Sequence, residues 1–264
     1  MKNIGIFTNN LPKTIEQSKK LRSKLIDKGF VINNKHPDIV IAVGGDGTLL
    51  SAFHHYENIV DKIRFTAVNA GHLGFYSDWS TDDMDQLVDS LCLDNGVSSD
   101  YSLLEIVVHF SNKNKTSGIH LALNEATLQR IRSTMISDVY LNKKLFEHFR
   151  GEGLCISSPT GSTAYNKSLG GAVVNSKLKV LQLTEIASIN NLVYRTLSSP
   201  MIISSEDHLV IVPDPKSEFI LTVDNHCFNR EDMSYITFSL SNQKMHFIKN
   251  NHINFWSRVH VSFI

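Results

Sequence analysis

The sequence lacks the features that mark secreted and membrane proteins. Its 264 residues contain only three cysteines (Cys92, Cys155 and Cys227), too few and too scattered for a disulfide framework or a CxxC metal site. No stretch reaches the roughly 20 apolar residues that cross a bilayer, and the first ten residues lack the apolar core of a signal peptide. The sequence therefore predicts a cytoplasmic protein with free thiols and no membrane partner.

An excess of charge is also absent. Lys and Arg together number 26, and so do Asp and Glu. Because no global basic field exists, nucleic acid is not an expected partner. The length is sufficient for two modest domains, each with its own core.

Several common catalytic motifs are missing. There is no Gly-x-x-x-x-Gly-Lys-Ser/Thr loop, and no Gly-x-Gly-x-x-Gly follows the first predicted strand. The Gly-x-Ser-x-Gly elbow and the His-Glu-x-x-His pattern are absent as well. These absences exclude a Walker-type NTPase and argue against an ordinary Rossmann dehydrogenase, an α/β-hydrolase and a zincin. No protein-held metal site is predicted.

The first hundred residues alternate between strand and helix patterns. Short apolar runs typical of strands occupy 3–7, 39–43 and 65–68, and amphipathic helices are predicted at 15–29, after 48 and at 81–93. This alternation predicts a Rossmann-like α/β domain over residues 1–100, with a parallel sheet covered by helices.

The remainder is rich in short β patterns. They occupy 103–110, 120–128, 137–146, 209–212, 218–223 and 235–240, with turn-like sequences at 142–144 and 241–243. We expect a β-rich, mostly antiparallel second domain over residues 101–249. The apolar segment 250–264 is expected to pack back on the first domain.

The most informative motif is Gly44-Gly45-Asp46-Gly47-Thr48, directly after the apolar run 38–43. Glycines between a buried strand and a helix let backbone N–H groups approach a phosphate. Asp46 is unexpected there, because a carboxylate repels phosphate unless it accepts a proton or holds a metal. The motif therefore indicates phosphoryl transfer, against the alternative of an ordinary strand–helix turn.

Three further segments could line a ligand. Residues 69–76 hold two glycines and Phe75, which either lines an adenine pocket or packs in the core. Asn124 and Glu125 follow an apolar run and could bind ribose hydroxyls, although solvated strand ends look the same. Segment 149–171 crowds hydroxyls such as that of Thr160 into a turn, where Tyr165 could stack on a base.

Taken together, these motifs resemble those of the bacterial NAD kinases. The resemblance rests on GGDGT at 44–48, GHLGF at 71–75, LNEAT at 123–127, GSTAYN at 161–166 and LTEIASIN at 183–190. The blocks follow the family's order and cover the chain from about residue 38 onward. A lone GGDGT is shared with diacylglycerol, sphingosine and 6-phosphofructo kinases, whereas the Asn-Glu and Thr-Ala-Tyr-Asn blocks point to NAD kinase.

The resemblance implies an α/β domain and a β-rich domain that bind NAD between them. ATP, or polyphosphate in some members, would phosphorylate the 2′-hydroxyl of the adenosine ribose, with Mg²⁺ accompanying ATP. Asp46 would take the hydroxyl proton, and a homotetramer is the usual assembly. By the same resemblance, the ligand-binding positions are Gly44, Gly45, Gly47, Phe75, Asn124, Glu125, Arg150, Glu152, Thr160, Thr163, Ala164, Tyr165, Asn166, Ser168, Ala187 and Asn225.

Three positions depart from the family pattern. Glu152 stands where Asp is usual, Asn225 where His is usual, and Leu192 where Arg is usual. These changes keep open a second hypothesis, a catalytically inactive protein that senses NAD or NADP. A third is a lipid or sugar kinase that uses the same GGDGT motif, although no membrane-binding amphipathic helix supports a lipid substrate.

Overall fold

The computed structural model describes residues 2–71, 74–112, 114–115, 117–229, 233–249 and 254–264. The chain forms two compact units, unit 1 (Met1–Tyr101 and Gln243–Ile264) and unit 2 (Ser102–Asn242). Strands β6 (Ser98–Phe110) and β17 (Met233–Ile248) run from one unit into the other. Residues 243–249 thus lie in unit 1, whereas the sequence pattern assigns them to the second domain.

Unit 1 is built on the parallel sheet that the alternating pattern predicts. Its order is β2 (Val31–Ile32), β1 (Asn3–Thr8), β3 (Ile39–Val43) and β4 (Arg64–Asn69), with β5 (Trp79–Ser80) and the end of β17 also parallel to β4. Every residue of β3 is buried. A strand covered on both faces favours a continuous β-branched run, which is why this segment is easy to recognise.

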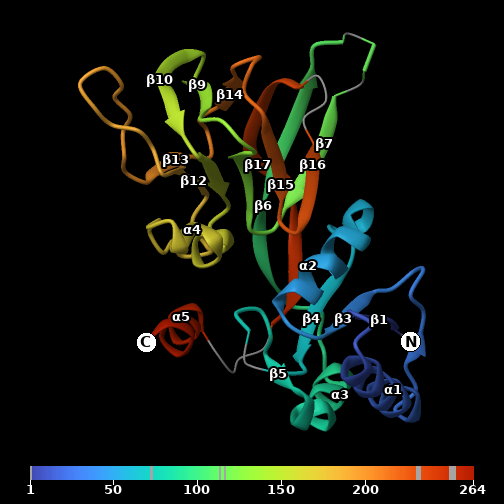
Figure 1. The fold of residues 1–264 in the computed structure, drawn as a ribbon. Helices are drawn as coiled ribbons and strands as arrows, with labels where there is room; N and C mark the ends of the chain where they lie inside the picture. The colour runs from blue at the N-terminus through green and yellow to red at the C-terminus, as the bar shows by residue number, and fades with distance from the viewer. Residues whose placement is uncertain (1, 72–73, 113, 116, 230–232, 250–253) are drawn as a thin grey trace. The chain divides into compact units, whose positions relative to one another are not determined.

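Helices complete unit 1 (Figure 1). Side chains of α1 (Pro12–Asp27) and α3 (Met84–Cys92) share one apolar cluster with β1, β3 and β4. Helix α2 (Asp46–His55) contacts β1 and β3, and α5 (Phe255–Phe263) lies near the C-terminus. Short 3-10 turns occupy Glu57–Ile59 and Thr81–Asp83. No helix among the described residues is long and apolar enough to cross a membrane.

Unit 2 is β-rich, as predicted. One sheet is antiparallel throughout, in the order β13 (Met201–Ser204), β12 (Val180–Ile186), β11 (Gly153–Ser157), β8 (Glu125–Arg130), β15 (Phe219–Val223) and β16 (His226–Asn229). Strands β10 (Lys144–Gly151), β9 (Met135–Leu141), β14 (Leu209–Pro213) and β17 form an antiparallel series, and β7 (Gly118–Ala122) pairs with β6. Apolar side chains from both groups of strands share one core.

Two turn predictions have opposite outcomes. The turn at 142–144 is confirmed, because Asn142 and Lys143 have φ values of 50° and 66° and join β9 to β10. The turn at 241–243 is wrong, since β17 continues through it to Ile248. Pairing of Phe247 with Phe65 on β4 extends this strand into unit 1 despite its polar middle. Segment 120–128, predicted as one strand, is divided between β7 and β8.

Candidate active site

Asp46 is the first residue of α2, where the chain leaves β3. Gly44 is required by close packing, because a Cβ there would lie 2.2 Å from the Thr48 hydroxyl. Gly45 and Gly47 are exposed, and a Cβ on either would meet nothing within 4 Å. Open space at a helix N-terminus, where N–H groups have no partner within the helix, suits an anionic ligand such as a phosphate.

The carboxylate of Asp46 is held by the segment that follows β4. Its two oxygens accept the N–H of Phe75 at 2.7 Å and the N–H of Tyr76 at 3.2 Å. Gly74 makes this approach possible, because a Cβ there would lie 2.3 Å from Asp46 Oδ1. The half-buried carboxylate therefore has a fixed direction, which a proton acceptor needs. His72 and Leu73, within the second predicted motif, lie outside the described residues.

Unit 2 organises Asn124 and Glu125 through one aspartate. Asp224, in the turn between β15 and β16, accepts the N–H groups of Leu123 at 2.9 Å, Asn124 at 2.8 Å and Glu125 at 3.3 Å. It adopts a φ of 49°, and its own N–H donates to Glu125 O. The Asp224 carboxylate therefore fixes the backbone of Asn124 and Glu125, the two predicted ligand-binding residues.

The hydroxyl-rich segment packs against the same backbone. The Ser158 hydroxyl donates to Leu123 O at 2.6 Å and accepts the Gly161 N–H at 3.1 Å. Gly161 lies so close to Asn124 that a Cβ would be 2.0 Å from Asn124 O. Unit 2 therefore brings two of the predicted motifs, 123–127 and 161–166, into contact.

Asn166 lies inside this arrangement. The side chain is fully buried; its amide donates to Ser157 Oγ and accepts from Thr184 Oγ1. Thr160 is also buried. Both residues therefore support the segment from within, and the neighbouring Thr163, Ala164, Tyr165 and Ser168 are more exposed.

Glu125 is an unusual carboxyl group. One oxygen, Oε2, is buried without a hydrogen-bond partner within the described part of the chain. Burial, followed by the nearby charge of Asp224, raises the pKa of Glu125 to about 8, and a hydrogen bond from the Tyr165 backbone opposes this shift. At neutral pH the group is mainly protonated, so it can donate a hydrogen bond to a ligand oxygen.

This protonation makes stability depend on pH. Between the ordinary pKa of 4.5 and about 8, the folded chain keeps a proton on Glu125 that the unfolded chain has lost. The free energy of unfolding therefore falls as pH rises through this window. We expect Glu125→Gln to raise the free energy of unfolding at pH 8 by about 1–3 kcal/mol and to flatten its pH dependence.

Thermal unfolding of both proteins at pH 5, 6, 7 and 8 measures this effect. Glu206→Gln, at an exposed turn in the same unit, is the matched control and should follow the parent chain at every pH. Glu147 also lowers the free energy of unfolding of the parent chain as pH rises, since burial raises its pKa to about 7. A parallel pH dependence in the parent and in Glu125→Gln would contradict the assignment.

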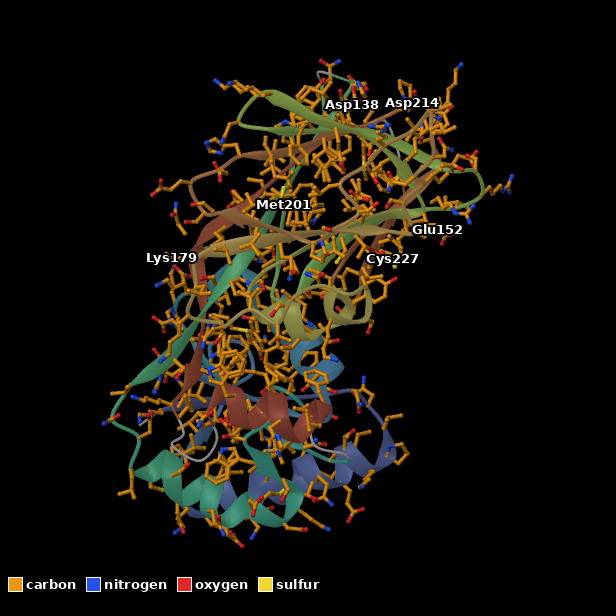
Figure 2. The ribbon with its side chains drawn as sticks, turned by 90° about the vertical axis from the view of Figure 1, so that its left-hand side faces the viewer. Asp138, Glu152, Lys179, Met201, Asp214 and Cys227 are labelled. Carbon is orange, nitrogen blue, oxygen red and sulfur yellow. The ribbon has the colours of Figure 1, made fainter. Side chains whose placement is uncertain are left out.

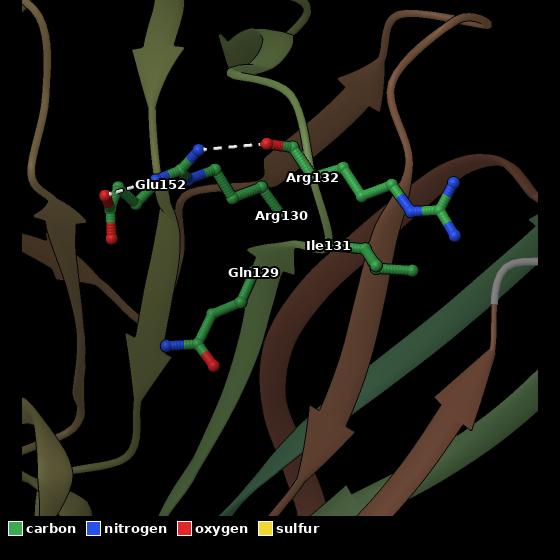
Figure 3. Close-up of a pocket in the computed structure, with 5 residues that line it drawn as sticks. All are labelled: Gln129, Arg130, Ile131, Arg132 and Glu152. Atoms are coloured by element: carbon green, nitrogen blue, oxygen red, sulfur yellow. Dashed lines mark hydrogen bonds and ion pairs between the residues drawn. The ribbon is translucent and has the colours of Figure 1, made fainter.

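Glu152 is held by an arginine. Its Oε1 accepts from Arg130 Nη2 at 2.6 Å, and Arg130 also donates to Arg132 O (Figure 3). Gln129, Arg130, Ile131, Arg132 and Glu152 line an open pocket of about 450 Å³ (Figure 3). Gln129 also donates to the Tyr165 hydroxyl at 2.9 Å. The longer carboxylate at this departure from the family pattern is thus directed to Arg130.

The remaining predicted residues are divided between the two ends of the six-stranded sheet: Glu152 and Ala187 lie at the Gln129 end, and Asn225 lies at the Glu125 end. Gly153 pairs with Ile186, so Glu152 and Ala187 are neighbours, and Glu152 lies on the opposite side of unit 2 from Lys179 (Figure 2). The Arg150 guanidinium lies 4.2 Å from the centroid of the Tyr194 ring. Asn225 is exposed in the turn beside Asp224.

Three important residues escaped the sequence motifs. Asp224 organises 123–125, Gln129 holds Tyr165, and Arg258 on α5 binds the segment that holds Asp46. Each acts through contacts with residues distant in the chain. Asp224 alone had a signal, since it directly precedes Asn225, one of the three departures from the family pattern.

Comparison with protein-family models matches both units. Residues 4–95 match the ATP-NAD kinase N-terminal domain, and residues 123–250 match the ATP-NAD kinase C-terminal domain. Curated relatives named NAD kinase are similar over nearly the whole chain. That of Latilactobacillus sakei is 45% identical over 99% of this chain and 97% of its own length, and that of Lactobacillus helveticus is 48% identical over 99% and 96%.

Solved structures share the fold. A yeast NADH kinase complexed with NADH aligns with a TM-score of 0.86 and 18% identity, covering 100% of this chain and 88% of that one. An NAD kinase from Archaeoglobus fulgidus in complex with ATP aligns with a TM-score of 0.73 and 18% identity, covering 94% of each chain. At this identity the likeness concerns the fold.

Proposed function

Because the chain belongs to the NAD kinase family, and so phosphorylates NAD to NADP, we propose that Asp46 takes the proton of the attacking hydroxyl. The observation that carries this proposal is the fixed direction of its carboxylate, which two backbone N–H groups hold at the N-terminus of α2. No other carboxylate occupies the GGDGT segment.

The reaction forms a bond between the ribose 2′-oxygen and the γ-phosphorus of ATP. The bond from that phosphorus to the oxygen bridging to the β-phosphorus breaks, and ADP leaves. A secondary hydroxyl is a weak nucleophile, so it needs a base as well as a positioned, neutralised phosphoryl group. Asp46 receives the hydroxyl proton, and the N–H groups at Gly45 and Gly47 stabilise the phosphate oxygens.

Dinucleotide binding is assigned to unit 2. Asn124 and protonated Glu125 offer donors on a backbone fixed by Asp224, and Tyr165 offers a half-exposed ring held by Gln129. Thr160 and Asn166 support this surface from inside. The other contacts that we propose in unit 2 are those of Arg150, Glu152, Thr163, Ala164, Ser168, Ala187 and Asn225.

The divalent cation is a substrate component in this proposal. Among the described residues, no group of three or more His, Cys, Asp or Glu side chains could hold a metal ion. We propose that the ion is Mg²⁺ and that it arrives with ATP, whose phosphates it would neutralise.

We also propose a cytoplasmic homotetramer. All three cysteines are free, as a reducing compartment would keep them. Unit 2 exposes apolar side chains between β12 and β13, including Leu192 at 96% and Val193 at 77%. Covering such side chains by another copy would remove apolar surface from water.

One assay tests the function. The purified chain is incubated with NAD, ATP and Mg²⁺, and NADP is measured with an NADP-specific dehydrogenase; we expect NADP and ADP in equal amounts. Parallel reactions replace ATP by polyphosphate and NAD by NADH, fructose 6-phosphate or diacylglycerol. Measurable NAD binding without NADP above background would instead support the sensor hypothesis.

A further inference from the structure

We propose that Arg258 is a positioning residue that fixes the Asp46 carboxylate through the backbone of Phe75. This inference rests on the proposed role of Asp46. It concerns unit 1 alone and a helix, α5, that none of the recognised motifs includes.

The backbone of Phe75 joins the side chains of Asp46 and Arg258. Its N–H donates to Asp46 Oδ2 at 2.7 Å, and its carbonyl oxygen accepts from Arg258 Nη1 at 2.6 Å. The same nitrogen lies 3.4 Å from Ser77 O, and Nη2 pairs with the carboxylate of Asp78. The guanidinium therefore holds the segment 75–78 at three points, using the fixed fork of donors that only arginine offers.

Aromatic packing holds the Phe75 side chain against the same helix. Its ring centroid lies 5.9 Å from that of Phe255 and 6.5 Å from that of Phe263, near the two ends of α5. The next residue, Tyr76, stacks on Phe247 of β17 with a centroid distance of 6.0 Å. Both N–H donors to Asp46 thus belong to residues whose rings are fixed within unit 1.

Burial of the Arg258 guanidinium costs free energy, which its contacts with Asp78 and the backbone of segment 75–78 must offset. The side chain of Arg258 is 13% exposed and that of Asp78 is 10% exposed, so the charges are largely removed from water. Burial lowers the pKa of Arg258, and the nearby Asp46 carboxylate opposes that shift.

Loss of this contact should affect turnover more than substrate binding. Without Arg258, the backbone of segment 75–78 loses its three guanidinium contacts, and aromatic packing alone holds the direction of the Asp46 carboxylate less firmly. A displacement of about 1 Å at a reacting group can cost up to about 100-fold in rate. The residues assigned to dinucleotide binding in unit 2 are unchanged by this substitution.

The test uses the full chain with steady-state kinetics. We expect Arg258→Gln to lower kcat by at least about 10-fold while the KM for NAD stays within about twofold. Arg258→Lys keeps the charge but loses the fork, so its kcat should be intermediate. An unchanged kcat in Arg258→Gln would overturn the proposal; if that variant does not fold, an unchanged kcat in Arg258→Lys would do so.

Arg64→Gln is the matched control. Arg64 pairs with Asp94 through two hydrogen bonds of 2.8 Å and 2.6 Å in the same unit, away from segment 75–78. It should lower the Tm without lowering kcat. If Arg258→Gln and Arg64→Gln lowered kcat equally, Arg258 would only stabilise unit 1 and would not position Asp46.

A double variant separates this inference from the role of Asp46. If Arg258 acts through Asp46, Arg258→Gln should lower kcat by less than about twofold when added to Asp46→Asn. Multiplicative losses would overturn the inference and leave the role of Asp46 intact. Normal turnover in Asp46→Asn alone would contradict the proposed function instead.

Discussion

Asp46→Asn should reduce turnover by at least about 100-fold and leave NAD binding nearly unchanged, because removal of a general base typically costs about 10²–10⁴ in rate. The amide cannot accept the hydroxyl proton at neutral pH. It also offers only one acceptor, whereas the carboxylate accepts two N–H groups, those of Phe75 and Tyr76. Single-turnover kinetics and NAD titration by calorimetry measure the two effects separately.

Asp38→Asn is the control for this substitution. Asp38 precedes the same strand, β3, and its carboxylate likewise accepts a backbone N–H, that of Asn3, at 2.7 Å. The change in charge and shape is identical, so turnover in Asp38→Asn should stay within about twofold of the parent. If Asp46→Asn kept near-normal turnover, Asp46 would be limited to holding segment 75–76, and another group would have to accept the proton.

The fold could be predicted wherever local pattern and tertiary environment agree. Strand β3 is buried on both faces, and its run of β-branched residues predicts this burial. At 241–243 the local sequence pattern and the tertiary environment disagree. Ser241, Asn242 and Gln243 have turn-like chemistry, but pairing on both sides of them keeps β17 continuous. Local propensity yields to tertiary context there, as it does generally for strands.

The candidate site was accessible from sequence only in part, for a similar reason. Asp46 and the glycines around it form one local motif whose chemistry can be read from neighbouring residues. The groups that hold the motifs in place come from elsewhere in the chain, as Asp224 does for Asn124 and Arg258 for Phe75. No periodicity or spacing encodes such contacts, so they require coordinates.

Gly161→Ala should be the most destabilising of the substitutions considered, and it should also weaken dinucleotide binding. A Cβ at this position would lie 2.0 Å from Asn124 O and 2.4 Å from Asn124 C. These are backbone atoms of the short connection between β7 and β8, which Asp224 already holds, so they cannot move aside as the end of a side chain could. We expect a loss of about 3–5 kcal/mol, or roughly 10 °C in Tm, and at least a tenfold rise in the Kd for NAD.

Gly118→Ala distinguishes this clash from a general effect of replacing glycine in unit 2. There the added Cβ would lie 3.2 Å from His120 Nε2, the far end of a side chain that can move. Its Tm should change by no more than about 2 °C. If Gly161→Ala were as stable as Gly118→Ala, Asn124 and the turn at 160–163 would not be in contact. The proposal that both belong to one dinucleotide-binding surface would then be wrong. If Gly161→Ala lost stability but bound NAD with unchanged affinity, the contact with Asn124 would be confirmed. Asn124 would then not belong to the dinucleotide site.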